Sequence, residues 1–529
     1  MARGRGSHVV PLFGTAFWPI SPSPCRRGRP RAGSRGPSVK HQPSDLTHAD
    51  VRRIILGIML AMFLGALDQT IVATALPTIG AEFGDFANLP WVVTSYLLAA
   101  TVATPLYGKL SDIRGRRVML LISVAVFSLA SLACALAPNL LFLIIARAVQ
   151  GLGGGGLISL AQTIIADVVA PRERPRYQAQ IAAVFAAASI LGPVMGGFFA
   201  QHLHWTLIFW INLPLGAAAY LMTDRTLRRL PRHDRRHDLD APGAALMGLS
   251  ALVLLLALNW GGVRLPWGSP EILGMLAASL VLGLLFVWRI RTVREPFISL
   301  DMLTDPVVGR AVPAAFAAAG TMVGLSIFVP LYFETVRGLS ASQSGLALIP
   351  LMGGIVCGAV MSGRLLARLT HYKRPGMIGC ASSALLLAAF ALAPGSLPLP
   401  ALVAGLAVVG VGIGTVLPMT TIAIQNAVTP HRMGTATGLM NFSRQLGGAM
   451  VVAVLGAVLL GFAGRTSGHD MEELARQAAP EALAGGFAYV FGTAALVLAM
   501  GFGFLVAMAE RPLRSSVRAA AEEAAGIAE

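Results

Sequence analysis

Long apolar runs separated by short polar segments occupy the chain from Ile54 onward. The runs are about 20 residues long, the length that a helix needs to cross the hydrocarbon core of a bilayer. Glycine is frequent within them, which suits close helix packing in lipid. The pattern predicts an all-α polytopic membrane protein with fourteen transmembrane helices near 54–76, 89–108, 117–137, 140–163, 177–200, 205–223, 241–259, 271–290, 311–333, 342–369, 374–394, 399–421, 436–462 and 484–508.

The polar segments between these runs alternate in charge. The link at 81–85 is acidic, the turn at 108–117 is strongly basic, and 137–139 is neutral, and this alternation continues to the end of the chain. Lysine and arginine gather in the cytoplasmic loops of membrane proteins. One missing or additional helix would place every later basic connection on the wrong side of the membrane, so the alternation favours fourteen helices with both termini in the cytoplasm.

The composition supports the membrane interpretation. Of the 529 residues, 55% are hydrophobic and only 12% are charged, and the mean hydropathy is +0.70. A soluble domain is closer to a quarter charged. The formal charge of +16 would suit nucleic-acid binding, but the basic residues lie between apolar runs and form no binding stripe, so we expect no nucleic-acid partner. Four single cysteines indicate neither a disulfide framework nor a zinc site.

A dense charged turn, GKLSDIRGRR, joins the second and third predicted helices. Gly108 and Gly115 supply the small residues that a tight turn needs. Asp112 lies close in sequence to Arg116 and Arg117, so its carboxylate has cationic partners nearby. A basic anchor that only sets topology is the alternative, but such an anchor needs neither the acid nor the paired glycines.

The spacing G-x-L-x-D-x-x-G-R-R between two membrane helices resembles the loop between helices 2 and 3 of the major facilitator superfamily. In that family the loop is part of the cytoplasmic gate, and its Asp and Arg hold the inside closed while the carrier faces outward. The resemblance implies this gate role for Gly108, Asp112, Gly115, Arg116 and Arg117.

The fifth predicted helix contains a second motif, LGPVMGG. Pro193 removes a backbone donor and bends the helix, while Gly192, Gly196 and Gly197 allow tight packing at the bend. The stretch resembles the antiporter motif of the same superfamily, which is found in exporters and is generally absent from uptake symporters. A kinked helix with a purely structural role is the alternative.

The stretches 205–216 and 441–448 are similar to helices 6 and 13 of fourteen-helix drug/proton antiporters in this superfamily. The resemblance implies a major facilitator fold, with two six-helix halves and two inserted helices. The stretch 363–368 partly repeats the pattern of the charged turn, which agrees with a fold built from repeated halves. Chance similarity between basic loops would also produce it. The expected divisions are a disordered basic tail at 1–50, the N-terminal half at 51–223, a linker with the two extra helices at 224–310, the C-terminal half at 311–509 and a cytoplasmic tail at 510–529.

Two ionisable residues lie deep within predicted spans, where each costs a few kcal/mol and is a functional candidate. At 1.5 Å per residue, Asp68 lies roughly 13 Å and Arg147 roughly 10 Å below the same outer face. The two would pair if their helices adjoin. Asp68 would then load and release a proton, and it could also attract a cationic drug. Satisfied structural charges or snorkelling side chains are the alternative.

Further polar candidates lie along the expected pathway. Arg147 opens a glycine-rich run that resembles the helix 4 motif of the family, whose Arg is linked to proton transfer, and Gln150 lies within that run. Gln69 follows Asp68, Arg444 lies in the inner part of its span, and Glu334 lies at the outer lip of the ninth helix. We treat Gln69, Gln150, Arg444 and Glu334 as pathway candidates.

The sequence as a whole favours a proton-coupled exporter of small hydrophobic drugs or antibiotics that works by alternating access in the cell membrane. No G-K-[ST] follows the glycine run and no catalytic or metal constellation is visible, so we expect no ATP, no cofactor, no metal and no enzymatic activity. Two alternatives stay open. One is a dedicated exporter of a single endogenous metabolite, and the other is a membrane sensor or scaffold on a transporter fold.

Overall fold

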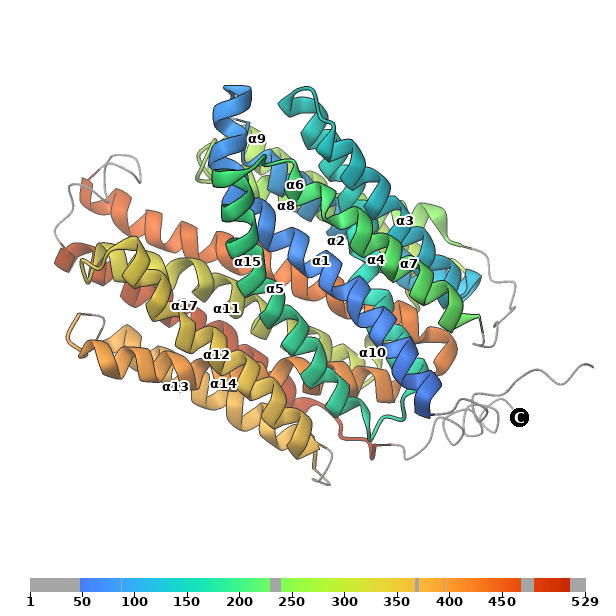
Figure 1. The fold of residues 1–529 in the computed structure, drawn as a ribbon. Coiled ribbons are helices and arrows are strands. Elements are labelled where there is room, and N and C mark those ends of the chain that lie inside the picture. Colours follow the sequence, from blue (N-terminus) through green and yellow to red (C-terminus); the bar gives the residue numbers. More distant parts are fainter. Residues whose placement is uncertain are drawn as a thin grey trace, which may run out of the picture. The chain divides into compact units, whose positions relative to one another are not determined.

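The computed structural model describes residues 48–86, 88–228, 239–366, 371–393, 395–467 and 480–513. The chain divides into Met1–Lys40 and His41–Glu529, and the fold described here is that of the second unit. Its helices (Figure 1) are α1 His48–Phe83, α2 Trp91–Arg114, α3 Arg116–Ala135, α4 Leu140–Val168, α5 Arg174–His202, α6 Leu207–Trp210, α7 Asn212–Leu227, α8 Ala241–Trp260, α9 Pro270–Thr292, α10 Leu300–Thr304, α11 Val308–Thr335, α12 Ala341–Leu366, α13 Lys373–Leu392, α14 Leu399–Ala427, the 3₁₀-helix η2 Pro430–Arg432, α15 Met433–Ser467 and α17 Pro480–Ala507.

Thirteen helices in the described part of the chain are long and apolar enough to cross a membrane, with α6 and α7 counted together as one span. The remaining long helix, α2, has 24 residues but carries several threonine, serine and tyrosine side chains that lower its hydropathy. With α2 included, the described helices match the fourteen predicted from the sequence. The multi-pass α-helical fold class is therefore confirmed.

Several helices are longer than their predicted apolar spans. We predicted that the first helix ends near residue 76, but α1 continues to Phe83 with Pro77 inside it. Likewise, α14 continues to Ala427 where an end near 421 was predicted. Hydropathy marks the stretch that lies in lipid, whereas hydrogen bonding lets a helix continue into the polar boundary. Most of the two predicted tails and residues 229–238 of the predicted linker lie outside the described residues, although α1 already begins at His48 and the described part extends to residue 513. Residues 471–476, where the sequence suggests one amphipathic turn, lie outside them as well.

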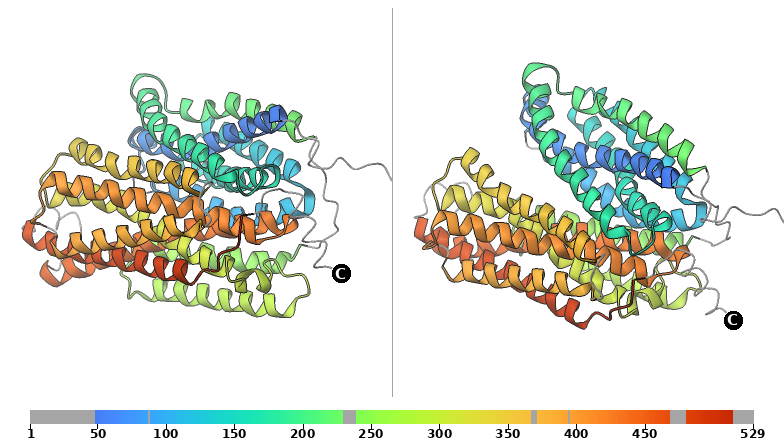
Figure 2. Two further views of the ribbon diagram at one scale, coloured as in Figure 1. Left: turned by 90° about the horizontal axis from the view of Figure 1, so that it is seen from below. Right: turned by 60° about the horizontal axis from the view of Figure 1, so that its bottom comes forward.

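The long helices pack in two groups. In the first group, α1–α7, helix α1 packs on α5 and α7, while α2 and α3 pack on α4. In the second group, α11–α17, helix α12 packs on α14, α11 on α15 and α13 on α17. Figure 2 shows the first group in blue to green and the second in yellow to red. The groups meet where α2 contacts α15 and where α5 contacts α12, and the inserted pair α8–α9 touches α2 and α15 through α8.

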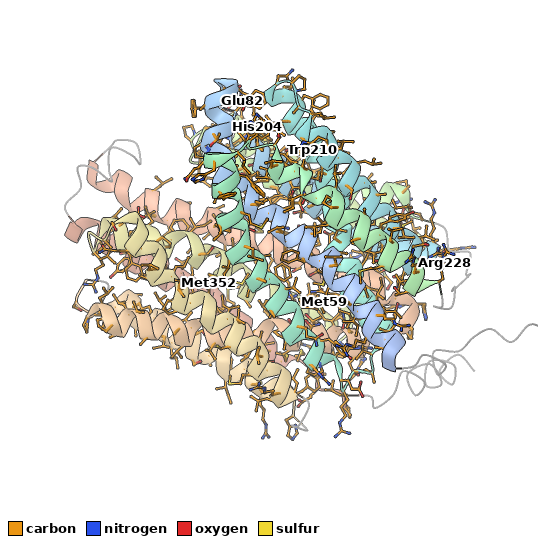
Figure 3. All side chains as sticks on the ribbon, viewed as in Figure 1. Met59, Glu82, His204, Trp210, Arg228 and Met352 are labelled. Carbon is orange, nitrogen blue, oxygen red and sulfur yellow. The ribbon has the colours of Figure 1, made fainter. Side chains whose placement is uncertain are left out.

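The arginine-rich connections lie at one end of the helices, which we call the basic end. It includes the α2–α3 turn, the start of α5 and the end of α7. Arg228 lies at this end of the first group, while Glu82 and His204 lie at the opposite end (Figure 3). The last described residues also lie at the basic end, because Arg511 donates to Asp305 just before α11 at 2.8 Å. The charge alternation along the sequence is therefore reflected in space.

Glycines let α4 lie very close to its neighbours. A Cβ atom at Gly151 would lie 2.3 Å from the carbonyl oxygen of Tyr96, and one at Gly155 would lie 2.4 Å from that of Ala100. Both carbonyls belong to α2, so the backbones of the two helices are almost in contact. This packing brings the polar side chains at the start of α4 against α2 and the adjacent helices.

Candidate functional site

Asp68 and Arg147 lie against each other inside the first group. Nη1 of Arg147 donates to Oδ2 of Asp68 at 2.6 Å, which joins α4 to α1. The Asp68 side chain is 0% exposed and that of Arg147 is 1% exposed. The similar depths counted from the sequence thus correspond to a contact between the two helices.

Three donors converge on the Asp68 carboxylate. In addition to Arg147, Nε2 of Gln150 reaches Oδ1 at 2.9 Å and Nδ2 of Asn212 reaches it at 3.0 Å. The same two amides donate to Oγ of Ser131, at 2.7 and 3.3 Å. Because these partners of the carboxylate are all donors, the geometry suits an ionised Asp68. We call Asp68, Ser131, Arg147, Gln150 and Asn212 the buried charge cluster.

Additional contacts hold the Arg147 guanidinium in place. Nε donates to the carbonyl of Val92 at 3.1 Å, and Nη1 also donates to Oε1 of Gln150 at 2.6 Å. The guanidinium carbon lies 4.3 Å from the centre of the Tyr96 ring, in a cation–π arrangement. The cation is therefore surrounded by partners from α2 as well as α1, and α4 is fixed to both helices.

Asn212 and Ser131 belong to this cluster, although neither was predicted from the sequence as a site residue. Depth along a helix can be counted from sequence, whereas the direction in which a side chain points depends on packing. The available signal was polarity, because each is a polar side chain within an apolar span and each is 0% exposed. Asn212 is also the first residue of α7, directly after the break at Ile211 that separates α6 from α7.

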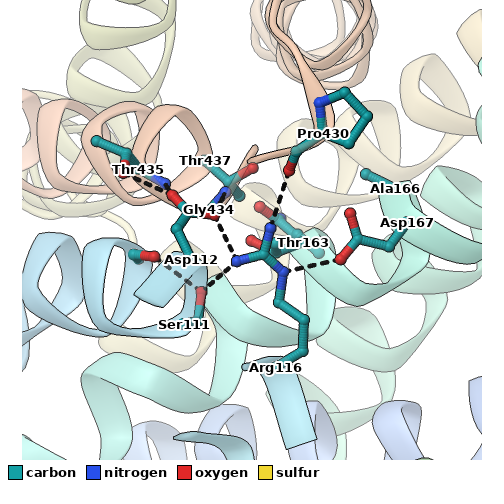
Figure 4. A network of polar contacts seen from close by, with 12 residues as sticks. Ser111, Asp112, Arg116, Thr163, Ala166, Asp167, Pro430, Gly434, Thr435 and Thr437 are labelled. Atoms are coloured by element: carbon teal, nitrogen blue, oxygen red, sulfur yellow. Dashed lines mark hydrogen bonds and ion pairs between the residues drawn. The ribbon is translucent and has the colours of Figure 1, made fainter. Parts of the chain in front are cut away.

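The α2–α3 turn contacts the start of α15 in the second group (Figure 4). Asp112 accepts hydrogen bonds from the backbone N–H of Gly434 at 3.0 Å and that of Thr435 at 2.7 Å, and from Oγ1 of Thr435 at 2.6 Å. Since α15 begins at Met433, Asp112 caps the N-terminus of a helix from the other group. A carboxylate there satisfies free N–H groups and is stabilised by the helix dipole.

Arg116 connects the same turn to two more elements. Its guanidinium donates to Asp112 at 2.5 Å, to Asp167 at the end of α4 at 2.8 Å, and to the carbonyl of Pro430 in η2 at 3.2 Å. These contacts join the two groups at the basic end. After the gate role that the resemblance in the sequence implies, we call the following residues the gate cluster: Asp112, Arg116, Asp167, Gly434 and Thr435.

Gly108, Gly115 and Arg117, the other predicted gate residues of the turn, lie outside the gate cluster. A Cβ atom at Gly108 would lie 2.4 Å from the carbonyl oxygen of Gly434, so the absence of a side chain allows the two groups to meet. Gly115 has a φ of +93°, a left-handed conformation that favours glycine, and it lies between α2 and α3. Arg117 pairs with Asp224 on α7 and thus stays within the first group.

More hydrogen bonds join the groups farther along α2 and α4. Oε1 of Gln445 on α15 accepts from Thr101 at 2.7 Å, and its Nε2 donates to Thr104 at 3.3 Å. Asn441 donates to the Gln162 side chain at 2.9 Å. The contacts between the groups therefore extend from the basic end into the membrane-spanning part.

The glycines of α5 pack unequally. A Cβ atom at Gly192 would lie 2.0 Å from Oγ1 of Thr70, and one at Gly196 would lie 2.4 Å from a backbone carbonyl oxygen of α1. A Cβ atom at Gly197 would have no neighbour within 4 Å. Pro193 lies inside the helix and is exposed. Gly192 and Gly196 thus allow α5 to approach the helix that carries Asp68.

Replacing Gly196 with Ala is expected to destabilise the protein by about 1–3 kcal/mol, the usual cost of overpacking a tight contact. The new methyl group would meet the carbonyl oxygen of Ile71, which cannot move without moving α1. Thermal unfolding in detergent measures the change. Gly197→Ala is the matched control and should leave the unfolding temperature unchanged, so equal effects of the two variants would contradict this packing argument.

The remaining pathway candidates are not members of either cluster. Gln69 is exposed next to Asp68, and Glu334 is exposed near the end of α11. Arg444 on α15 is partly exposed and lies against α14. Within the described ranges, no group of three or more His, Cys, Asp or Glu residues could hold a metal ion.

Comparison with known proteins identifies the family of the chain. The family model of the Major Facilitator Superfamily matches residues 58–452. The chain belongs to the Major Facilitator Superfamily. The family expected from the charged turn is thereby confirmed, and the chain is a transporter and not an enzyme.

Two relatives within the superfamily come from Bacillus subtilis (strain 168). Multidrug transporter protein MdtP is 32% identical over 408 residues, which cover 77% of this chain and 75% of that protein. Multidrug resistance protein 3 is 32% identical over 419 residues, or 78% of this chain and 80% of that protein. Among solved structures, the human organic anion transporter MFSD10 (TETRAN) has a TM-score of 0.61 at 19% identity over 86% of this chain and 99% of its own, which shows a shared fold.

Proposed function

We propose that this transporter exports hydrophobic drugs or antibiotics from the cytoplasm in exchange for protons. The observation that carries the proposal is the buried ion pair of Asp68 and Arg147, with Nη1 of Arg147 at 2.6 Å from Oδ2 of Asp68 within the membrane-spanning part. Ionisable groups in such positions are costly and typically mark proton or substrate pathways. The printed names of the relatives, a multidrug transporter and a multidrug resistance protein, support drug-like substrates.

A proton on Asp68 would act on several helices at once. It would cancel the charge that faces Arg147, and it would place an O–H donor among the N–H donors of Gln150 and Asn212. The contacts that hold α1 to α4 and α7 would weaken together. Because α1 packs on α5, and α5 contacts α12 of the second group, this change would reach the boundary between the groups.

The gate cluster gives the second half of the proposed cycle. Basic connections favour the cytoplasmic side of the cell membrane, so in our proposal the basic end and both termini lie in the cytoplasm. The contacts of Asp112 with Gly434 and Thr435 then close the cytoplasmic side. Alternating access requires these contacts to break and re-form in each cycle, and proton binding at Asp68 would bias that equilibrium.

The test is dye flux in proteoliposomes under an imposed pH gradient, with a panel of cationic, neutral and anionic dyes that includes ethidium. Ethidium is permanently cationic, so a pH gradient alone does not trap it. We expect uptake into vesicles with an acidic lumen, loss of uptake when a protonophore is added, and no uptake in empty vesicles. Absence of flux for every compound would instead favour the sensor or scaffold. Protection against a single compound in a growth-inhibition panel would favour a dedicated metabolite exporter.

A further inference from the structure

Charged side chains are rare in the interior of the described spans. Asp68, Arg147 and Arg444 lie well inside their helices, whereas the other charged residues of the described spans lie near helix ends. Asp68 and Arg147 neutralise each other at 2.6 Å. Of these three interior charges in the described part of the chain, Arg444 is therefore the one without a counter-charge.

The partners of Arg444 are all neutral. Nη2 donates to the carbonyl of Leu417 and to the hydroxyls of Thr420 and Thr421, at 3.2 and 2.9 Å for the two hydroxyls. Nε is buried and has no hydrogen-bond partner, and no acid in the described residues acts on this guanidinium. An Arg whose role is only structural would be expected to meet a carboxylate, as Arg147 does, because an unbalanced charge in lipid is costly.

Arg444 also lies beside the boundary between the two groups. Residues three or four apart share one face of a helix, so Arg444 is next to Asn441, which donates to Gln162 of the first group at 2.9 Å. The following residue, Gln445, accepts from Thr101 at 2.7 Å. The Arg444 side chain is partly exposed, so a ligand between the groups could reach it.

One exposed apolar side chain lies close to the contact between Thr101 and Gln445. Leu97 of α2 lies one turn from Thr101 and leaves 45% of its surface exposed. A cationic group next to apolar surface suits a molecule with an acidic head and a hydrophobic body. Arg pairs especially well with carboxylates, since two of its N–H groups can bind both oxygens.

We propose that Arg444 binds the acid group of the substrate, and that the preferred substrates are amphipathic organic anions with a single carboxylate. The assignment rests on the proposed export function, because it names the class of compound that the exporter carries. In this arrangement the substrate carboxylate supplies the counter-charge that Arg444 lacks. The substrate leaves the Asp68–Arg147 pair intact, so the proton and the substrate occupy different residues.

Binding to purified protein without any pH gradient tests the assignment. The probes are pyrenebutyrate and its neutral amide, which share one fluorescent body and differ in the acid. Wild type should bind the acid at least about tenfold more tightly than the amide, and Arg444→Gln should remove that preference while leaving the amide affinity unchanged. Arg444→Lys should retain part of the preference, because it keeps the charge.

Arg310→Gln is the matched control, since this partly exposed Arg at the start of α11 donates to the backbone carbonyl of Pro306 and its loss changes the net charge equally. It should leave both affinities unchanged. Equal weakening of acid and amide in Arg444→Gln, or no acid preference in wild type, would overturn the assignment. A failure of proton-driven flux in the vesicle experiment would leave this binding result intact, so the two proposals can fail separately.

Discussion

Replacing Asp68 with Asn is expected to abolish proton-driven dye uptake while sparing dye exchange that moves no net proton. The variant keeps the shape of the side chain but cannot carry a proton between its ionised and neutral forms. Exchange of labelled for unlabelled dye needs the carrier to open on each side, but it does not need the proton to be released. Comparing the two kinds of flux in the same vesicles therefore separates proton coupling from substrate movement.

The same substitution should reduce stability, because Arg147 would remain buried without its counter-charge. Breaking one side of a buried pair typically costs about 3–5 kcal/mol. We therefore include the double variant Asp68→Asn with Arg147→Gln, which removes both charges and should recover much of the stability without recovering coupling. Asp301→Asn, at an exposed position on α10, is the control. Proton-driven uptake by the double variant would refute the role of Asp68.

The contact between Asp68 and Arg147 could be predicted in part, because similar depth can be counted from the sequence, whereas the adjacency of α1 and α4 comes from the structure. Both residues interrupt apolar runs, and counting 1.5 Å per residue from each helix end gives similar levels in the membrane. The count used Pro77 as the end of the first helix, and α1 in fact continues to Phe83. The predicted contact is unaffected by this error. The number of residues between Asp68 and Pro77, from which the depth was counted, is the same in the longer helix.

Membership of the gate cluster could be predicted only in part. The charge and the glycines of the turn identify Asp112 and Arg116 as candidates. Their partners Asp167 and Thr435, however, come from distant parts of the sequence. Nothing local marks Thr435 as the first turn of a helix that Asp112 caps. Arg117 shows the same limit, since its partner Asp224 depends on how α7 packs against α3. Local patterns identify a charged turn, whereas tertiary packing selects its partners.

Replacing Gly108 with Val is expected to abolish transport without unfolding the protein. A Cβ atom at this position would lie 2.4 Å from the carbonyl oxygen of Gly434, which belongs to the backbone of the other group. The groups would have to separate at the basic end, and the contacts of Asp112 with the start of α15 would be lost. Because the clash lies between the groups and not within one, the thermal unfolding temperature should change little while dye flux falls to that of empty vesicles.

Thiol labelling can measure directly whether the two groups of helices separate at the basic end. In a background with the four native cysteines replaced, Ser111→Cys places a thiol at a position that is 2% exposed and adjacent to the gate cluster. A membrane-impermeant maleimide added to inside-out vesicles should label this thiol slowly when Gly108 is present and rapidly in the Gly108→Val variant. Gly274→Val is the matched control, because a Cβ atom at Gly274 on α9 would have no neighbour within 4 Å. Equal labelling in all three backgrounds would mean that the α2–α3 turn does not close the basic end. Intact transport by the Gly108→Val variant would mean that the close approach of Gly108 to Gly434 is dispensable.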